Sequence, residues 1–284
     1  IDKILITKKN IKWINILRNT PGIFILNDNG TIDDTSDDTY KTYRTLISSS
    51  DNKNMNTNGF YCLTEDKNGA IYIGTGNGLA ICTNPNSVPA SENLIITRPT
   101  REAADGTLSY FLDGEQINTI AVDGGNRKWI GTQNSGIFLI NEDASETIKN
   151  FTTSNSPILS NTVISIAIDP ISGRVYVGTN KGITSYLSDA TEGKENYSNV
   201  YAYPNPVRPE DIDQVTIAGL MENSNVKITD LNGNLIYQGK SVGGQLTWNC
   251  RNRSGNRVAT GIYLVLAATQ DSKESVVTKI MIVK

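Results

Sequence analysis

Asp113 and Glu115 are the two side chains whose types and spacing most resemble a catalytic pair, because two carboxylates can act as general acid and general base. Nothing in the sequence fixes their separation or buries them, so we assign no catalytic residue. The chain of 284 residues contains no histidine, which excludes a Ser-His-Asp or Cys-His arrangement within it. We therefore expect a protein that is not an enzyme.

Residues that could bind a metal ion gather in one acidic stretch, NDNGTIDDTSDDT at residues 27–39. Calcium prefers oxygen ligands, but the spacing departs from the EF-hand loop, and a solvated acidic loop is expected. The three cysteines, Cys62, Cys82 and Cys250, lack the CxxC spacing of a zinc site and are expected to be free and buried. No metal and no cofactor is expected.

The charge balance argues against a nucleic-acid partner, because 26 Lys and Arg residues against 29 Asp and Glu residues give a net charge of −3. No apolar run is long enough to cross a bilayer. The chain begins with Ile instead of Met, which indicates a mature product or a fragment of a longer protein.

The dominant pattern is a repeat. An aromatic residue, an aliphatic residue, Gly-Thr, a short polar turn and a second apolar run recur in AIYIGTGNGLAICTN (70–84), RKWIGTQNSGIFLIN (127–141) and RVYVGTNKGITSYLS (174–188). A weaker copy spans residues 11–28, where Asn15 takes the place of the glycine. An alternating apolar run precedes each copy, and in the later three it ends in an acid and a turn. Such alternation, rich in β-branched and aromatic residues, predicts strands.

Each repeat unit is predicted to be an antiparallel sheet of four strands, A to D, and such units bury their faces by stacking radially as the blades of a β-propeller. The glycine weakens strand B unless the neighbouring blade packs closely there, and the threonine hydroxyl can hold the turn between strands B and C. YKTYRTLIS (40–48) and TIKNFTT (147–153) are expected as outer strands D. Blades are predicted at residues 1–58, 59–114, 115–160 and 161–199. The last blade has no evident strand D, and the chain is expected to be part of a larger propeller.

Residues 200–284 have a different character and are predicted to form a small Ig-like β-sandwich. The prolines of YAYPNPVRPED (201–211) exclude a central strand there and suit a stiff junction. Alternating apolar runs follow from residue 214 to the end, and KITDLNGNLIYQ (227–238) is typical of a hairpin with an Asn-Gly turn. The predicted fold class is therefore all-β, with propeller blades followed by a sandwich.

A ligand site is expected on the propeller face where the B–C loops and the D–A loops, which join consecutive blades, emerge together. Side-chain amides can hydrogen-bond sugar hydroxyls, and aromatic rings can cover the apolar faces of sugars. Ordinary solvated loops are the competing interpretation. The candidate ligand-binding residues are Arg18, Asn19, Asn77, Tyr110, Phe111, Gln133, Asn134, Asn180 and Lys181.

Both halves resemble known families. The units INTIAVDGGNRKWIGTQNSGIFLIN (117–141) and VISIAIDPISGRVYVGTNKGITSY (163–186) resemble the two-component-regulator propeller repeats of Bacteroidetes. VYAYPNPV (200–207), VKITDLNGNLIYQG (226–239) and GIYLVLAATQ (261–270) resemble the C-terminal sorting domain of type IX secretion. Together they are similar to the PorZ type of secretion component. That family offers no catalytic motif.

The resemblance implies an exported protein in the periplasm, at the outer membrane surface or outside the cell. Its expected role is non-enzymatic recognition or scaffolding, with envelope or secretion proteins and a glycan or lipopolysaccharide as partners. One alternative is the glycan-sensing ectodomain of a hybrid two-component regulator, which a membrane span and a kinase after Lys284 would favour. Another is a polysaccharide-active propeller enzyme, against which the absence of histidine weighs.

Overall fold

The computed structural model describes residues 3–17, 20–87, 91–102, 105–211, 214–271 and 275–283. These residues form β-strands and one short 3-10 turn, Pro85–Ser87. Contacts divide the chain into two compact units. The first contains Ile1–Val122, Asn126–Ala167 and Tyr176–Ser185, and the second contains Asp123–Gly125, Ile168–Val175 and Tyr186–Lys284.

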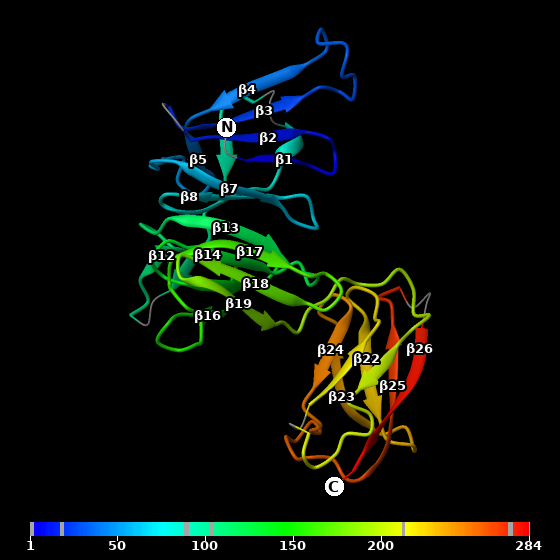
Figure 1. Ribbon diagram of the computed structural model, residues 1–284. Helices are drawn as coiled ribbons and strands as arrows, with labels where there is room; N and C mark the ends of the chain where they lie inside the picture. The colour runs from blue at the N-terminus through cyan, green and yellow to red at the C-terminus, as the bar shows by residue number, and fades with distance from the viewer. Residues whose placement is uncertain are drawn as a thin grey trace. The chain divides into compact units, whose positions relative to one another are not determined.

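Four consecutive antiparallel sheets follow the repeat, and their strands coincide with the predicted strands A, B, C and, in two of them, D (Figure 1). In the first unit, β7 lies against β1 and β2, and β13 lies against β7 and β8, so successive sheets pack as propeller blades. Blade 1 contains β1 (Ile4–Ile6), β2 (Lys12–Ile16), β3 (Gly22–Asn27) and β4 (Thr39–Tyr43); blade 2 contains β7 (Phe60–Glu65), β8 (Ile71–Thr75) and β9 (Gly78–Cys82); blade 3 contains β13 (Ile117–Val122), β14 (Lys128–Thr132), β15 (Ile137–Ile140) and β16 (Thr147–Phe151); blade 4 contains β17 (Val163–Ile168), β18 (Arg174–Thr179) and β19 (Gly182–Leu187).

One predicted outer strand is shorter than expected. The structure ends β4 at Tyr43 and places residues 46–48 in a separate strand, β5 (Leu46–Ser48). This strand pairs in parallel with β10 (Leu94–Ile96), and Leu46 and Leu94 are both fully buried in the core that blades 1 and 2 share. Burial of two leucines against each other therefore overrides continuation of the blade. The remaining strands of this unit are β6 (Asn54–Met55), β11 (Thr100–Glu102) and β12 (Leu108–Tyr110).

The polar residues of the repeat fold its turns. Between strands A and B of blade 2, Asp66 Oδ1 accepts hydrogen bonds from the backbone N–H groups of Asn68 and Ala70, both at 2.9 Å. Between strands B and C, the Thr75 hydroxyl donates to the Gly78 carbonyl at 2.8 Å, as expected from the sequence. The same B–C bond recurs in the later blades, from Thr132 to Gly136 and from Thr179 to Gly182. The recurring acid and threonine are thus explained by local turn geometry.

The recurring glycine gives the next blade room to approach, which confirms the sequence expectation. A Cβ atom on Gly74 would lie 2.8 Å from Cγ2 of Ile117 and 2.9 Å from its carbonyl oxygen. A Cβ on Gly131 would lie 2.5 Å from Cγ1 of Val163. Ile117 and Val163 both begin strand A of the following blade. Any side chain at these glycines would push adjacent blades apart.

A buried ion pair also joins blades 2 and 3. Lys128 Nζ lies 3.0 Å from Asp66 Oδ2, and the two side chains are 0% and 3% exposed. The same ammonium group lies 4.4 Å from the ring centre of Tyr72 and donates to the carbonyl of Glu142. Asp66 therefore folds the turn of its own blade and neutralises a lysine of the next one.

The second unit contains a β-sandwich of two sheets, as predicted. The core between them contains Trp248 and Ile217 from one sheet and Ile228, Val265 and Ile280 from the other. This packing of two antiparallel sheets is the Ig-like architecture. One sheet has the order β20 (Tyr201–Tyr203), β21 (Val215–Ala218), β24 (Gln245–Trp248), and the other has the order β23 (Leu235–Lys240), β22 (Asn225–Thr229), β25 (Gly261–Ala268), β26 (Ser275–Ile282).

The proline-rich segment is part of this sandwich, whereas the sequence had favoured a junction. Strand β20 lies at the edge of its sheet. Pro204 and Pro206, which follow it, therefore interrupt no hydrogen bonds between the strands of the sheet. Val207 then donates its N–H to the Met281 carbonyl at 2.8 Å. Tyr197, inside the range predicted for the last blade, packs in the sandwich core. The residue ranges proposed for the four blades and the sandwich remain predictions.

We predict that Gly131→Ala lowers the free energy of unfolding of the propeller unit by about 1–3 kcal/mol, because the added methyl group overpacks the contact with Val163. Urea denaturation followed by tryptophan fluorescence measures this, since Trp129 lies buried beside the site. The control is Gly261→Ala in β25, where a Cβ meets open space. Equal effects of the two substitutions would contradict the interpretation.

We predict that Asp66→Asn costs about 3–5 kcal/mol of stability, because it leaves the Lys128 ammonium buried without a counter-charge while keeping an oxygen for the turn. Thermal unfolding measures the loss. Adding Lys128→Met should restore most of it. Glu210→Gln, which removes the exposed pair with Arg208, should change stability by less than about 1 kcal/mol. A double variant as unstable as Asp66→Asn alone would refute this account.

Candidate functional site

The B–C turn of blade 2 is tied to both neighbouring D–A loops through Asn77. Its Nδ2 donates to the carbonyl of Asn56 at 2.9 Å, and its Oδ1 accepts from the N–H of Gly114 at 2.6 Å. Its own carbonyl accepts from Arg98 at 3.3 Å. The Asn77 amide thus holds the loop face together, and both of its polar ends are occupied.

Tyr110 lies in a cluster of charged side chains on these loops. The Arg98 guanidinium carbon lies 3.8 Å from the centre of the Tyr110 ring, and Arg98 pairs with Asp113 at 2.6 Å. The Tyr110 hydroxyl donates to Asp51 Oδ2 at 3.1 Å. The pKa of Asp51 is lowered, chiefly by the backbone N–H of Lys53 and also by the Tyr110 hydroxyl, so Asp51 is an anion. Arg98 and Asp51 were not predicted from the sequence, because no repeat pattern marks them.

Glu115 positions the B–C turns of two consecutive blades. Its carboxylate accepts from the N–H of Asn134 and from the hydroxyl of Ser135, both at 2.8 Å. Its backbone carbonyl accepts from the N–H of Gly78 in the preceding blade at 2.9 Å. Asp113 is engaged separately with Arg98. The two carboxylates that resembled a catalytic pair therefore have different structural partners.

The remaining candidate residues fall into four groups. Gln133 and Asn134 lie on the turn that Glu115 supports, where Gln133 Oε1 accepts from Asn118 at 3.0 Å. Asn180 and Lys181 are exposed on the corresponding turn of blade 4. Phe111 is 5% exposed and packs edge-on against Phe138, so the structure corrects its assignment to the ligand surface. Arg18 and Asn19 lie outside the described residues.

The acidic stretch at residues 27–39 is held by its own loop. Asp28 pairs with Lys12, and Asp37 accepts a hydrogen bond from the Thr31 hydroxyl at 2.9 Å. The hydroxyl and N–H of Ser36 bind Asp34 and lower its pKa. Over the residues that the structure describes, Cys, Asp and Glu side chains form no group of three or more suited to a metal ion.

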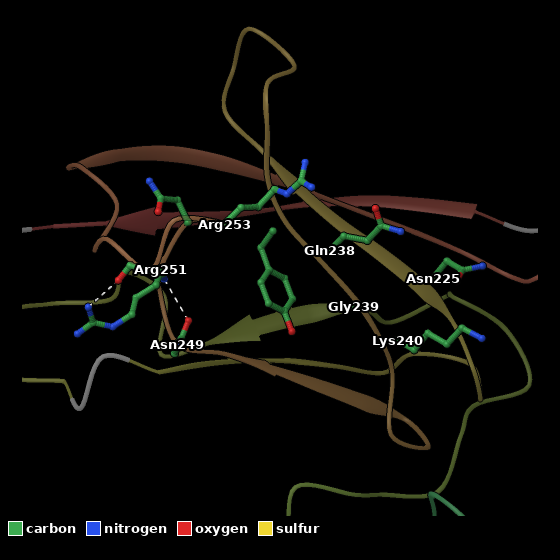
Figure 2. A pocket seen from close by; sticks show the side chains of 10 residues that line it. Asn225, Gln238, Gly239, Lys240, Asn249, Arg251 and Arg253 are labelled. Atoms are coloured by element: carbon green, nitrogen blue, oxygen red, sulfur yellow. Dashed lines mark hydrogen bonds between the residues drawn. The ribbon is translucent and has the colours of Figure 1, made fainter.

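A shallow hollow of about 710 Å³ opens on the sandwich, and none of the residues selected from the sequence lines it (Figure 2). One side is formed by the end of β23 and the other by the loop that follows β24. Figure 2 shows Gln238, Lys240, Arg251 and Arg253 around it. The lining residues are Asn225, Tyr237, Gln238, Gly239, Lys240, Asn249, Arg251, Asn252, Arg253 and Gly255.

Comparison with known proteins gives matches for both halves of the chain. Residues 201–284 match the secretion system C-terminal sorting domain, and residues 54–77 match the two component regulator propeller. None of the curated proteins compared with the chain matches it.

Among solved structures, the chain is similar to PorZ, an essential bacterial surface component of the type-IX secretion system of Porphyromonas gingivalis. The identity is 36% and the TM-score is 0.69, over 99% of this chain and 38% of the PorZ chain. A second likeness is to the extracellular domain of a hybrid two component system, BT4673, from B. thetaiotaomicron, with 14% identity and a TM-score of 0.42 over 99% of this chain and 36% of that one.

These matches define the class of protein: propeller repeats of the two-component-regulator type followed by an Ig-like sorting domain. Within that class the chain is PorZ-like, and it spans 38% of the length of the PorZ chain. The sorting domain and the likeness to PorZ make it an exported protein of the cell surface or periplasm. In the described part of the chain, no helix has the length and apolar character needed to span a membrane.

We predict that the three thiols resist alkylation in the native protein. All are free and buried, and burial raises the pKa of Cys62 to about 12 and the pKa values of Cys82 and Cys250 to about 11. Because the thiolate is the reactive form, iodoacetamide at pH 8 should modify none of them before unfolding and all three in urea. Mass spectrometry counts the adducts. A thiol modified at the same rate in both states would contradict this prediction.

Proposed function

We propose that the chain is a non-enzymatic recognition and scaffold part of a PorZ-like surface component associated with type-IX-type secretion. The likeness to PorZ and the sorting domain support this role. The functional groups of the loop face also fit it, because Asp113, Glu115 and Asn77 are occupied in holding loops together. Envelope or secretion proteins are the proposed protein partners.

We further propose that the propeller loop face binds a glycan or the saccharide part of lipopolysaccharide. The observation that carries this proposal is that the loop face presents exposed amide side chains on a backbone that hydrogen bonds hold in place. Asn134 is exposed, yet its backbone is held by the Glu115 carboxylate at 2.8 Å. Preorganised polar groups lose little conformational entropy when a ligand binds. Tyr110 adds a ring, and Asn180 and Lys181 add an amide and a cation.

The test is a binding measurement of the whole chain with purified lipopolysaccharide and with a panel of soluble glycans. We expect Asn134→Ala combined with Lys181→Glu to weaken binding of a retained glycan about tenfold or more, because each removes a polar contact. Asn232→Ala, on an exposed sandwich turn, serves as the control. If the double variant binds the retained glycan as tightly as the unmodified chain does, the assignment of the glycan site to the loop face is refuted. Turnover of a glycan would refute the non-enzymatic role.

A further inference from the structure

The charged side chains that line the hollow on the sandwich are all positive. Three of its lining residues are cations, Lys240, Arg251 and Arg253, and its lining contains no acidic residue. Within the described part of the chain, neither Lys240 nor Arg253 has an ion-pair partner. This differs from the chain as a whole, whose net charge is −3. A surface of this kind attracts an anionic partner.

The loop that presents the two arginines is held in place. The indole N–H of the buried Trp248 donates to the carbonyl of Arg251 at 2.9 Å, and the Arg251 guanidinium donates to the carbonyl of Gly255 at 2.9 Å. Asn252 Oδ1 accepts the backbone N–H groups of Ser254 and Asn256, both at 3.0 Å. Little loop ordering is therefore required before a ligand can bind.

The opposite wall is an unpaired sheet edge. Strand β23 is the edge strand of its sheet. One of its sides pairs with β22, and its other side pairs with no strand among the described residues. Among the described residues, backbone groups from Ile236 to Lys240 make no backbone hydrogen bond beyond that pairing. Such an edge can accept another extended chain. The Tyr237 hydroxyl lies next to Gly239, because a Cβ atom on Gly239 would be 2.9 Å from the hydroxyl oxygen.

We propose that this hollow binds an extended acidic peptide segment of a partner protein, which adds as a strand to the edge of β23 while its carboxylates face Lys240, Arg251 and Arg253. Main-chain hydrogen bonds to β23 would hold the peptide, and the basic loop would select its acidic side chains. Because side chains alternate along a strand, acids at every second position would all lie on one face of the added strand. The site lies on the sandwich and uses none of the propeller residues.

A peptide fits these observations better than a compact anion. The cations are spread along an open hollow, and the side chains of Lys240, Arg251 and Arg253 are exposed, so they do not enclose a single small group. The unpaired backbone of β23 has no role in binding a small anion, whereas strand addition uses it directly.

The experiment measures binding of the whole chain to a fluorescent decapeptide of alternating glutamate and valine, blocked at both ends. A second decapeptide has lysine in place of glutamate, and a third carries N-methyl groups on alternate backbone amides. We expect binding of the first peptide only, with hydrogen-exchange protection appearing at residues 236–240. The N-methyl groups should abolish it because they remove the donors that strand addition needs.

Matched chain variants locate the site. Arg253→Glu and Lys240→Glu should each weaken binding of the glutamate peptide about tenfold or more, while Lys279→Glu on the other edge strand, β26, gives the same net charge and should change binding little. Failure to bind the glutamate peptide, equal binding of its N-methylated form, or equal loss with Lys279→Glu would overturn the proposal. Binding of polygalacturonate in place of the peptide, lost in Arg253→Glu, would reassign the hollow to acidic saccharides.

Discussion

The constraint on which the propeller unit depends is the close approach of strand B, in blades 2 and 3, to the first residue of the next blade. At Gly74 and Gly131, the adjacent Ile117 and Val163 occupy the space that a Cβ would take. Neither glycine has a positive φ, so the requirement is room for the neighbour and not a special backbone conformation. Because Ile117 and Val163 directly follow the interblade loops, this packing also fixes where those loops emerge.

Two polar connections act at opposite ends of the contact between blades 2 and 3. At the A–B end, the buried pair of Asp66 and Lys128 crosses the boundary. At the B–C end, Glu115 binds Gly78 of one blade through its carbonyl and Asn134 of the other through its carboxylate. The apolar contact brings the sheets together, and the polar groups limit how they can slide or rotate, because each has only one arrangement in which it is satisfied.

The sequence was sufficient to predict the strands, the interblade glycine and the threonine turn bond, since alternation and turn chemistry are local. It was insufficient for contacts between distant segments. The parallel pairing of β5 with β10 and the burial of Phe111 against Phe138 depend on which surfaces meet after folding. The hollow combines Lys240 with Arg253 across a strand edge, and no motif joins them. Asn77 lies on the B–C turn of blade 2, and its amide is already used by the protein.

A single local turn appears in both units, and the choice between Asp and Asn in it sets the electrostatics nearby. The side chains of Asp66, Asp230 and Asn252 each accept hydrogen bonds from the backbone N–H groups of the residues two and four positions later. In each turn the residue three positions later is a glycine of positive φ. The turn therefore needs an oxygen but no charge. In blade 2 the charge of Asp66 is used by Lys128. At residue 252 the neutral amide of Asn252 folds the same turn without placing a carboxylate beside the arginines. The turn itself therefore does not neutralise the positive charge of the basic loop.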